Sequence, residues 1–182
     1  MPELPEVQTV VDCVAPDLLG RKINSCKIYN GYDRPLCGRS IRSIQSKLKN
    51  NRIKNVSRRA KYIVLSLERG FLTMHLRMTG QIVFAAKPPK HTTFSLLFSS
   101  NKSNHMHFVD VRKFGTIVYS DDLNYLEKKL GVEPLTSSFN KKFLRKLLSE
   151  KNTKLKALLL DQKYIAGPVS YTHLTLPTTP YV

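Results

Sequence analysis

Hydrophobic spacing near the start of the chain predicts an amphipathic helix over residues 5–15. Apolar side chains recur there at helical intervals and form one face, made of Val7, Val10, Val11 and Val14. Pro16 and Gly20 are expected to close the segment, because proline interrupts helical hydrogen bonding and glycine allows the chain to turn. Burial of this face would anchor the first residues of the chain in the core.

Between residues 22 and 119 the pattern changes to short apolar and β-branched runs separated by turn residues, which is typical of strands. A hairpin turn is expected at 68–70 and a short helix at 43–49. Many short antiparallel strands favour a β-sandwich. The expected strands are 22–29, 52–57, 62–67, 71–77, 81–84, 93–98, 105–110 and 116–119.

Helical spacing returns after residue 120. Three helices are expected, capped by Asp121 or Asp122, by Ser137 or Ser138, and by Thr153. The predicted fold class is therefore α+β, with an N-terminal helix and an antiparallel β-sandwich followed by a helical module.

The charge of the chain indicates what kind of partner it binds. The 182 residues include 30 Lys and Arg against 13 Asp and Glu, a net charge of +17 that favours a polyanionic partner. Ribosomal and membrane-surface proteins share such a bias. No stretch approaches the length of a membrane-spanning helix, and the N-terminus does not follow a signal-peptide pattern. Three cysteines without a Cys-x-x-Cys pair indicate reduced thiols in the cytosol and no zinc site.

The first residues carry unusual chemistry. Removal of Met1 would give Pro2 a free secondary amine, and an α-amino group has a pKa of about 7.7–8.0. Such an amine can attack a sugar C1′, expel the base and leave an iminium that favours elimination of phosphate. Glu3 and Glu6 lie beside it, and Glu3 can act as a general acid or base. The same residues are also ordinary at a helix N-terminus.

The opening M-P-E-L-P-E-V resembles that of the bacterial formamidopyrimidine-DNA glycosylases (Fpg), and Leu4 fits them better than the related endonuclease VIII. The resemblance implies a base-excision-repair DNA glycosylase and AP lyase that removes oxidised purines, such as 8-oxoguanine and formamidopyrimidines. It implies that Pro2 is the Schiff-base nucleophile and Glu3 the proton donor. The strand would then be cleaved by β,δ-elimination.

Two basic motifs agree with the resemblance. R-R-A-K-Y at residues 58–62 resembles the family's basic motif, which implies that Lys61 contacts phosphate and donates a proton for elimination. A solvated basic turn is the alternative. Lys90-His91 resembles the start of K-H-x-H, with Thr93 in place of the second histidine, and implies that His91 holds backbone phosphate.

Two further loops resemble those that fill the duplex when a nucleotide is extruded. H-L-R-M-T-G at residues 75–80 implies that Met78 occupies the void. D-V-R-K-F-G at residues 110–115 implies that Arg112 faces the opposite base and that Phe114 wedges beside it. A core methionine and a basic β-turn are the alternatives.

Two other groups were weighed for binding. K-A-L-L-L-D-Q at residues 156–162 matches a family segment that implies a DNA-binding Lys156. His105 and His107 alternate on one expected strand and have no carboxylate or cysteine partner at suitable spacing. We expect them to be ordinary surface or core histidines rather than metal ligands.

The expected domains are an Fpg-type catalytic sandwich at 1–120 and a partial helix–two-turns–helix module at 121–167. Residues 168–182 contain no Lys, Arg, Asp or Glu and depart from the family pattern, so they are expected to be an artefactual, unstructured tail. The family's four-cysteine zinc finger is expected to be absent. No metal or other cofactor is therefore expected in this chain.

The leading hypothesis is a C-terminally truncated Fpg-type enzyme that acts on double-stranded DNA containing oxidised purines. We expect a cytoplasmic bacterial monomer that acts at the nucleoid and does not bind membranes. The alternative is a non-catalytic basic DNA-binding fragment that is inactive because of truncation.

Overall fold

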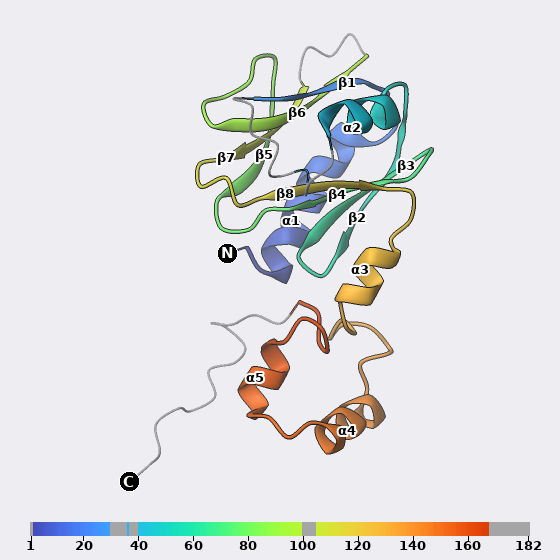
Figure 1. Ribbon diagram of the computed structural model, residues 1–182, viewed down its shortest axis with the longest axis vertical. Helices are drawn as coiled ribbons and strands as arrows, with labels where there is room; N and C mark the ends of the chain where they lie inside the picture. Colours follow the sequence, from blue (N-terminus) through green and yellow to red (C-terminus); the bar gives the residue numbers. More distant parts are fainter. Residues whose placement is uncertain (1, 30–35, 37–39, 100–104, 168–182) are drawn as a thin grey trace. The chain divides into compact units, whose positions relative to one another are not determined.

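The structure is a computed structural model that describes residues 2–29, 36, 40–99 and 105–167 (Figure 1). The chain divides into two compact units, Met1–Asp122 and Leu123–Val182. The predictions for removal of Met1, for Cys37 and for the tail at 168–182 lie outside the described residues.

The first unit contains two four-stranded antiparallel sheets and two helices, α1 (Leu4–Leu18) and α2 (Ile41–Leu48). The predicted α+β fold is confirmed. One sheet has the order β1 (Ile23–Ile28), β6 (Thr92–Phe98), β7 (His105–Asp110), β5 (Gly80–Ala85). The other has the order β2 (Ile53–Arg59), β3 (Tyr62–Leu67), β4 (Phe71–His75), β8 (Thr116–Ser120).

Helix α1 packs its apolar face into the core and against β2 and β3. Val7, Val11, Val14 and Leu18 are buried there, and Val10 is partly buried. The helix continues past Pro16, so the predicted end was wrong. A proline in the last turns removes one backbone hydrogen bond, and burial of Leu18 offsets that loss. The chain then turns at Gly20, whose φ is +74°.

All eight predicted strands are present, with ends shifted by a few residues. The strand predicted at 71–77 ends earlier, at His75, and this difference matters most for the site. Arg77 has a φ of +56°, in the left-handed region, and lies in a turn. Residues 76–79 therefore form a loop between β4 and β5 and not a strand end.

The second unit contains α3 (Asn124–Lys129), α4 (Lys141–Glu150) and α5 (Leu155–Leu160). The predicted caps were wrong, since the N-cap positions are occupied by Leu123, Asn140 and Lys154. Only Asn140 caps with its side chain, accepting a hydrogen bond from the Phe143 backbone N at 3.0 Å. Leu147, Leu158 and Ile165 form the small apolar core of this unit.

Among the described residues, no helix is both long enough and apolar enough to cross a membrane. His107 is 1% exposed and behaves as a core histidine, as predicted. Its Nε2 lies 3.1 Å from the Ala85 carbonyl oxygen, which can only accept, so Nε2 carries the proton. Nδ1 then accepts from the Ser95 hydroxyl at 2.6 Å. The ring is held neutral between β6, β7 and β5.

This buried ring predicts an acid-sensitive fold. Burial lowers the pKa of His107 below its ordinary value of 6.5, and the neighbouring charge of His105 adds to that effect, although the hydrogen bond with Ala85 opposes it. The unfolded chain therefore binds a proton first as pH falls. His107 contributes stability that is fully present above pH 6.5 and is lost as pH falls toward the folded-state pKa.

Urea titrations between about pH 7.5 and 5.5 should show the free energy of unfolding decreasing with pH. His107→Gln should flatten this dependence, and His105→Gln should retain most of it. Equal slopes in the wild type and His107→Gln would contradict the assignment.

Candidate functional site

The two-residue turn between β2 and β3 brings Lys61 to the start of α1. Arg59 pairs with Tyr62, and Ala60 takes a φ of +51°, as the first position of a tight hairpin turn requires. Lys61 is only 7% exposed. Burial lowers the pKa of its ammonium group, and the negative charges of Glu3 and Glu6 oppose that shift. A buried lysine thus lies within the electrostatic reach of both N-terminal acids.

The acids are held by the helix they begin. Glu3 is the N-cap residue of α1, and its backbone N donates to a Glu6 carboxylate oxygen at 2.9 Å. The backbone N of Val7 donates to the Glu3 carbonyl oxygen at 2.9 Å. Pro2 directly precedes this cap and is half-buried. Figure 1 shows the first residues of α1 and the β2–β3 turn at the same end of the first unit.

Arg58 joins the hairpin to the helix. Its Nε donates to Gln8 Oε1 at 3.0 Å, and its Nη1 donates to the Ala60 carbonyl oxygen at 2.9 Å. Gln8 in turn donates to Asp12 on the same face of α1. A guanidinium bonded to both elements fixes the distance between Lys61 and the helix start. The sequence prediction gave Arg58 no role, although it belongs to the same basic motif as Lys61.

Strand pairing places the other predicted loops at the same edge of the sandwich. His75, the last residue of β4, pairs with Tyr62 on one side and with Thr116 on the other. The rings of Tyr62 and His75 also meet edge to face at 4.6 Å. The loops 76–79 and 111–115 therefore leave the sheets beside the turn that carries Lys61. We call this edge, with the start of α1, the rim.

Three predicted residues from two of these loops form one exposed cluster. Arg112 Nη1 donates to Met78 Sδ at 3.2 Å, and the guanidinium carbon lies 5.1 Å from the centre of the Phe114 ring. Met78 is 49% exposed and Phe114 is 44% exposed, so neither is core filler. Large apolar side chains held in water beside a cation are suited to contact a partner. We call Met78, Arg112 and Phe114 the wedge cluster.

The remaining predicted residues are placed differently. His91 is exposed on the loop before β6, with a φ of +64°, and its carbonyl oxygen accepts from the Asp110 backbone N at 3.0 Å, which brings it to the rim. Lys156 lies half-buried on α5, in the second unit.

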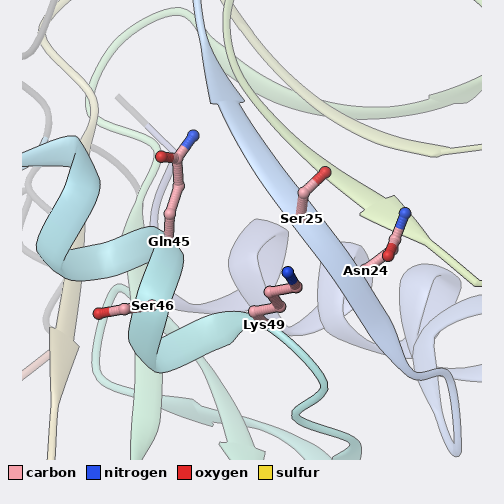
Figure 2. A pocket seen from close by; sticks show the side chains of 5 residues that line it. All are labelled: Asn24, Ser25, Gln45, Ser46 and Lys49. Carbon is pink, nitrogen blue, oxygen red and sulfur yellow. The ribbon is translucent and has the colours of Figure 1, made fainter.

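A separate depression of about 440 Å³ lies between β1 and α2 (Figure 2). Asn24 and Ser25 reach it from β1, and Gln45, Ser46 and Lys49 reach it from the helix side. None of the predicted site residues lines it. Within the described part of the chain, no three His, Cys, Asp or Glu side chains gather in a way that could hold a metal ion. The family's zinc therefore has no fitting ligand set among the described residues.

Known proteins are similar to this chain in sequence and in fold. The family model for the formamidopyrimidine-DNA glycosylase N-terminal domain matches residues 1–117. Formamidopyrimidine-DNA glycosylases of Pelotomaculum thermopropionicum and Protochlamydia amoebophila are 38% and 36% identical over 92% of this chain. The Lactococcus lactis enzyme, solved with DNA that contains an AP site, has a TM-score of 0.81 at 32% identity, over 92% of this chain and 65% of its own.

These relatives are formamidopyrimidine-DNA glycosylases, and several solved ones are bound to DNA that contains an AP site, an oxidised pyrimidine or a modified Fapy-dG. This chain belongs to the formamidopyrimidine-DNA glycosylase family. It spans 62% of the Pelotomaculum protein and 61% of the Protochlamydia protein. The predicted family is thereby confirmed, whereas the individual residue roles stay predictions.

The left-handed backbone at Arg77 predicts a stabilising substitution. A non-glycine residue in this region costs roughly 1–2 kcal/mol, and glycine avoids that cost at some loss of chain entropy. Arg77→Gly should raise the free energy of unfolding by up to about 1 kcal/mol, because its backbone N can still donate to His75 Nδ1. Urea unfolding measures the change. Arg42→Gly, within α2, should lower stability by about 1 kcal/mol and serves as the control. A loss of stability in Arg77→Gly would contradict the expectation.

Proposed function

We propose that this chain removes oxidised purine bases from double-stranded DNA and cleaves the strand at the resulting abasic site. The single observation that carries the proposal is that Lys61, buried on the turn between β2 and β3, lies within electrostatic reach of Glu3 and Glu6 at the start of α1. A buried cation, two acids and an amine on one rim supply the groups that glycosidic attack and elimination require.

In the proposed reaction Met1 has been removed, and the neutral amine of Pro2 forms a bond to C1′ of the sugar while the bond from C1′ to the base breaks. The base leaves with the bonding electrons and takes up the proton that the Pro2 nitrogen loses. Glu3 protonates the ring oxygen, so the sugar opens to an iminium linked to Pro2. A secondary amine gives an iminium that cannot be neutralised by losing a proton from nitrogen. It therefore withdraws electrons until C2′ loses a proton and the 3′ phosphate departs. Loss of a proton from C4′ then expels the 5′ phosphate.

Lys61 has two proposed tasks. Its cation binds the phosphate beside the lesion, and it donates a proton during elimination. Its low exposure supports the first task, because a charge in a water-poor setting attracts phosphate more strongly than one in bulk water. The nearby charges of Glu3 and Glu6 keep the ammonium form populated against the effect of burial.

The wedge cluster supports a duplex substrate. An enzyme that works on a base must take it out of the stack, and apolar or planar side chains inserted into the gap offset the cost of unstacking. Met78 and Phe114 supply the apolar surface, and Arg112 can contact the edge of the opposite base. His91 adds a phosphate contact at the rim, and Lys156 is a further proposed DNA contact on α5. The chain's net charge of +17 is consistent with this partner.

Borohydride trapping on an oligonucleotide with an abasic site tests the mechanism. The chain with a free Pro2 amine should form a covalent adduct, because borohydride reduces the iminium. The same chain with retained Met1 or an acetylated N-terminus should form none. Intact mass identifies which N-terminus is present. Equal trapping by the blocked protein would refute the role of Pro2, and binding without trapping by the free protein would favour a non-catalytic DNA-binding domain.

Base excision tests the proposed proton donor. Glu3→Gln should slow the release of 8-oxoguanine by about 10²–10⁴-fold, the usual contribution of a general acid. Asp17→Asn, an exposed carboxylate on the same helix, should leave the rate unchanged. Equal rates for Glu3→Gln and the wild type would contradict the assignment.

Salt titration of DNA binding tests Lys61. Removing one phosphate contact should weaken binding and lower the slope of log K against log salt by about 0.9. Lys61→Gln should show this loss. Lys54→Gln, which removes an exposed charge on β2, should show little change. An unchanged slope in Lys61→Gln would count against a phosphate contact.

A further inference from the structure

Three loops at the rim converge on one residue, Asp110, whose buried carboxylate has no role in the proposed chemistry. Asp110 is the last residue of β7 and is 1% exposed. The loop 76–79 lies on one side of it and the loop 111–115 follows it directly. The residue before β6, His91, is its backbone neighbour. Every rim residue proposed to touch the duplex outside the N-terminus and Lys61 belongs to these loops.

Hydrogen bonds connect Asp110 to each loop. Its Oδ1 accepts from Thr79 Oγ1 at 2.5 Å and from the backbone N of Arg112 at 3.2 Å. Its Oδ2 accepts from the backbone N of Gly115 at 2.7 Å. Its own backbone N donates to the His91 carbonyl oxygen at 3.0 Å. The hydroxyl of Thr79 also accepts from the backbone N of Arg112 at 3.2 Å, which closes the network.

The fit around this carboxylate is tight. A Cβ on Gly115 would lie 2.5 Å from the Phe108 ring and 3.1 Å from Asp110 Oδ2, so only glycine allows the loop to approach so closely. Gly80 pairs with Asp110 across the sheet, and a Cβ there would collide with the Leu76 carbonyl oxygen. Gly115 therefore lets the loop 111–115 close against the carboxylate, and Gly80 lets the loop 76–79 close tightly on its own first residue, Leu76.

The chemistry of the network needs a carboxylate. All three groups that face the side chain are donors, and an ionised aspartate offers acceptors only. Asparagine has one acceptor oxygen, and its amide nitrogen would face a donor in either orientation. Hydrogen bonds to an ionised acceptor are also stronger than those between neutral groups.

We propose that Asp110 is a positioning residue for duplex opening. It holds the loops 76–79 and 111–115 in one arrangement, so that Met78, Arg112 and Phe114 enter the stack as a preformed unit. Asp110 itself does not touch DNA. The proposal rests on the proposed function, because it assigns to this network the step that precedes attack by Pro2. A preformed wedge avoids the cost of ordering two loops at the moment of insertion.

The proposal separates duplex opening from chemistry. Pro2, Glu3 and Lys61 are carried by the start of α1 and by the β2–β3 turn, and Arg58 fixes their spacing independently of Asp110. A single-stranded abasic oligonucleotide has no stack to open. Loss of Asp110 should therefore slow reaction with duplex DNA and leave reaction with single-stranded DNA nearly unchanged.

The experiment uses Asp110→Asn in the full chain and measures borohydride trapping rates on one abasic sequence, presented as duplex and as single strand. The duplex rate should fall at least about 10-fold, since misplacement of binding groups by about 1 Å costs up to about 100-fold. On single-stranded DNA, the trapping rate of Asp110→Asn should stay within about 2-fold of the wild-type rate. Asp121→Asn, an exposed carboxylate at the end of β8, should alter neither rate.

A second variant covers the case in which Asp110→Asn does not fold. Thr79→Val removes one donor to the carboxylate and keeps the side-chain shape, so it should lower the duplex rate by a smaller factor and spare the single-strand rate. Thermal unfolding establishes that each variant is folded. Equal losses on both substrates, or no loss on duplex, would overturn the proposal.

Failure of the proposed function would give a different result. If the wild type forms no adduct with either substrate, the Pro2 mechanism fails. The role of Asp110 is then tested by an assay of duplex opening that does not depend on catalysis. A 2-aminopurine placed opposite the abasic site reports unstacking by its fluorescence. The wild type should increase that fluorescence more than Asp110→Asn does. Equal increases would overturn the role of Asp110 whether or not the chain is catalytic.

Discussion

Burial of the apolar face of α1 is the interaction on which the candidate site depends. Val7, Val11, Val14 and Leu18 lie in the core, and the helix packs on β2 and β3. A chain end is ordinarily frayed, because few contacts offset the entropy of ordering it. Here the helix begins two residues after Pro2, so core packing orders the backbone next to the proposed nucleophile. The Arg58 bonds to Gln8 and Ala60 then fix the Lys61 turn against it.

Antiparallel pairing gathers the remaining groups at the same rim. Because β3, β4 and β8 alternate in direction, the start of β3, the end of β4 and the start of β8 share one edge. The connections to β5 and from β7 leave from that edge and carry the wedge cluster. Exposed apolar residues in loops are costly unless a partner covers them. Because the wedge cluster shares this edge with buried Lys61, the proposed chemistry and the proposed duplex contact fall on one edge of the sandwich.

Sequence patterns predicted the elements better than their ends. The valine spacing gave α1, and alternating runs gave all eight strands, since both depend on burial that repeats along the chain. The helix end predicted at Pro16 was wrong, because burial of Leu18 stabilises the helix beyond that proline. The caps were misplaced because Ser, Thr and Asp are plentiful after residue 120, and only Asn140 was oriented to accept from the helix. Cap choice depends on local backbone angles that composition does not encode.

By itself, the sequence determined the family, the α+β class and the identities of the residues proposed to act, because short motifs and periodic burial are local properties. Only the tertiary structure decided that Lys61 is buried beside Glu3 and Glu6, although more than fifty residues separate them. It also decided that Arg112 meets Met78 and that Asp110 bonds the loops on both sides. These contacts arise from strand order and register, which are set by the whole core and not by any one segment.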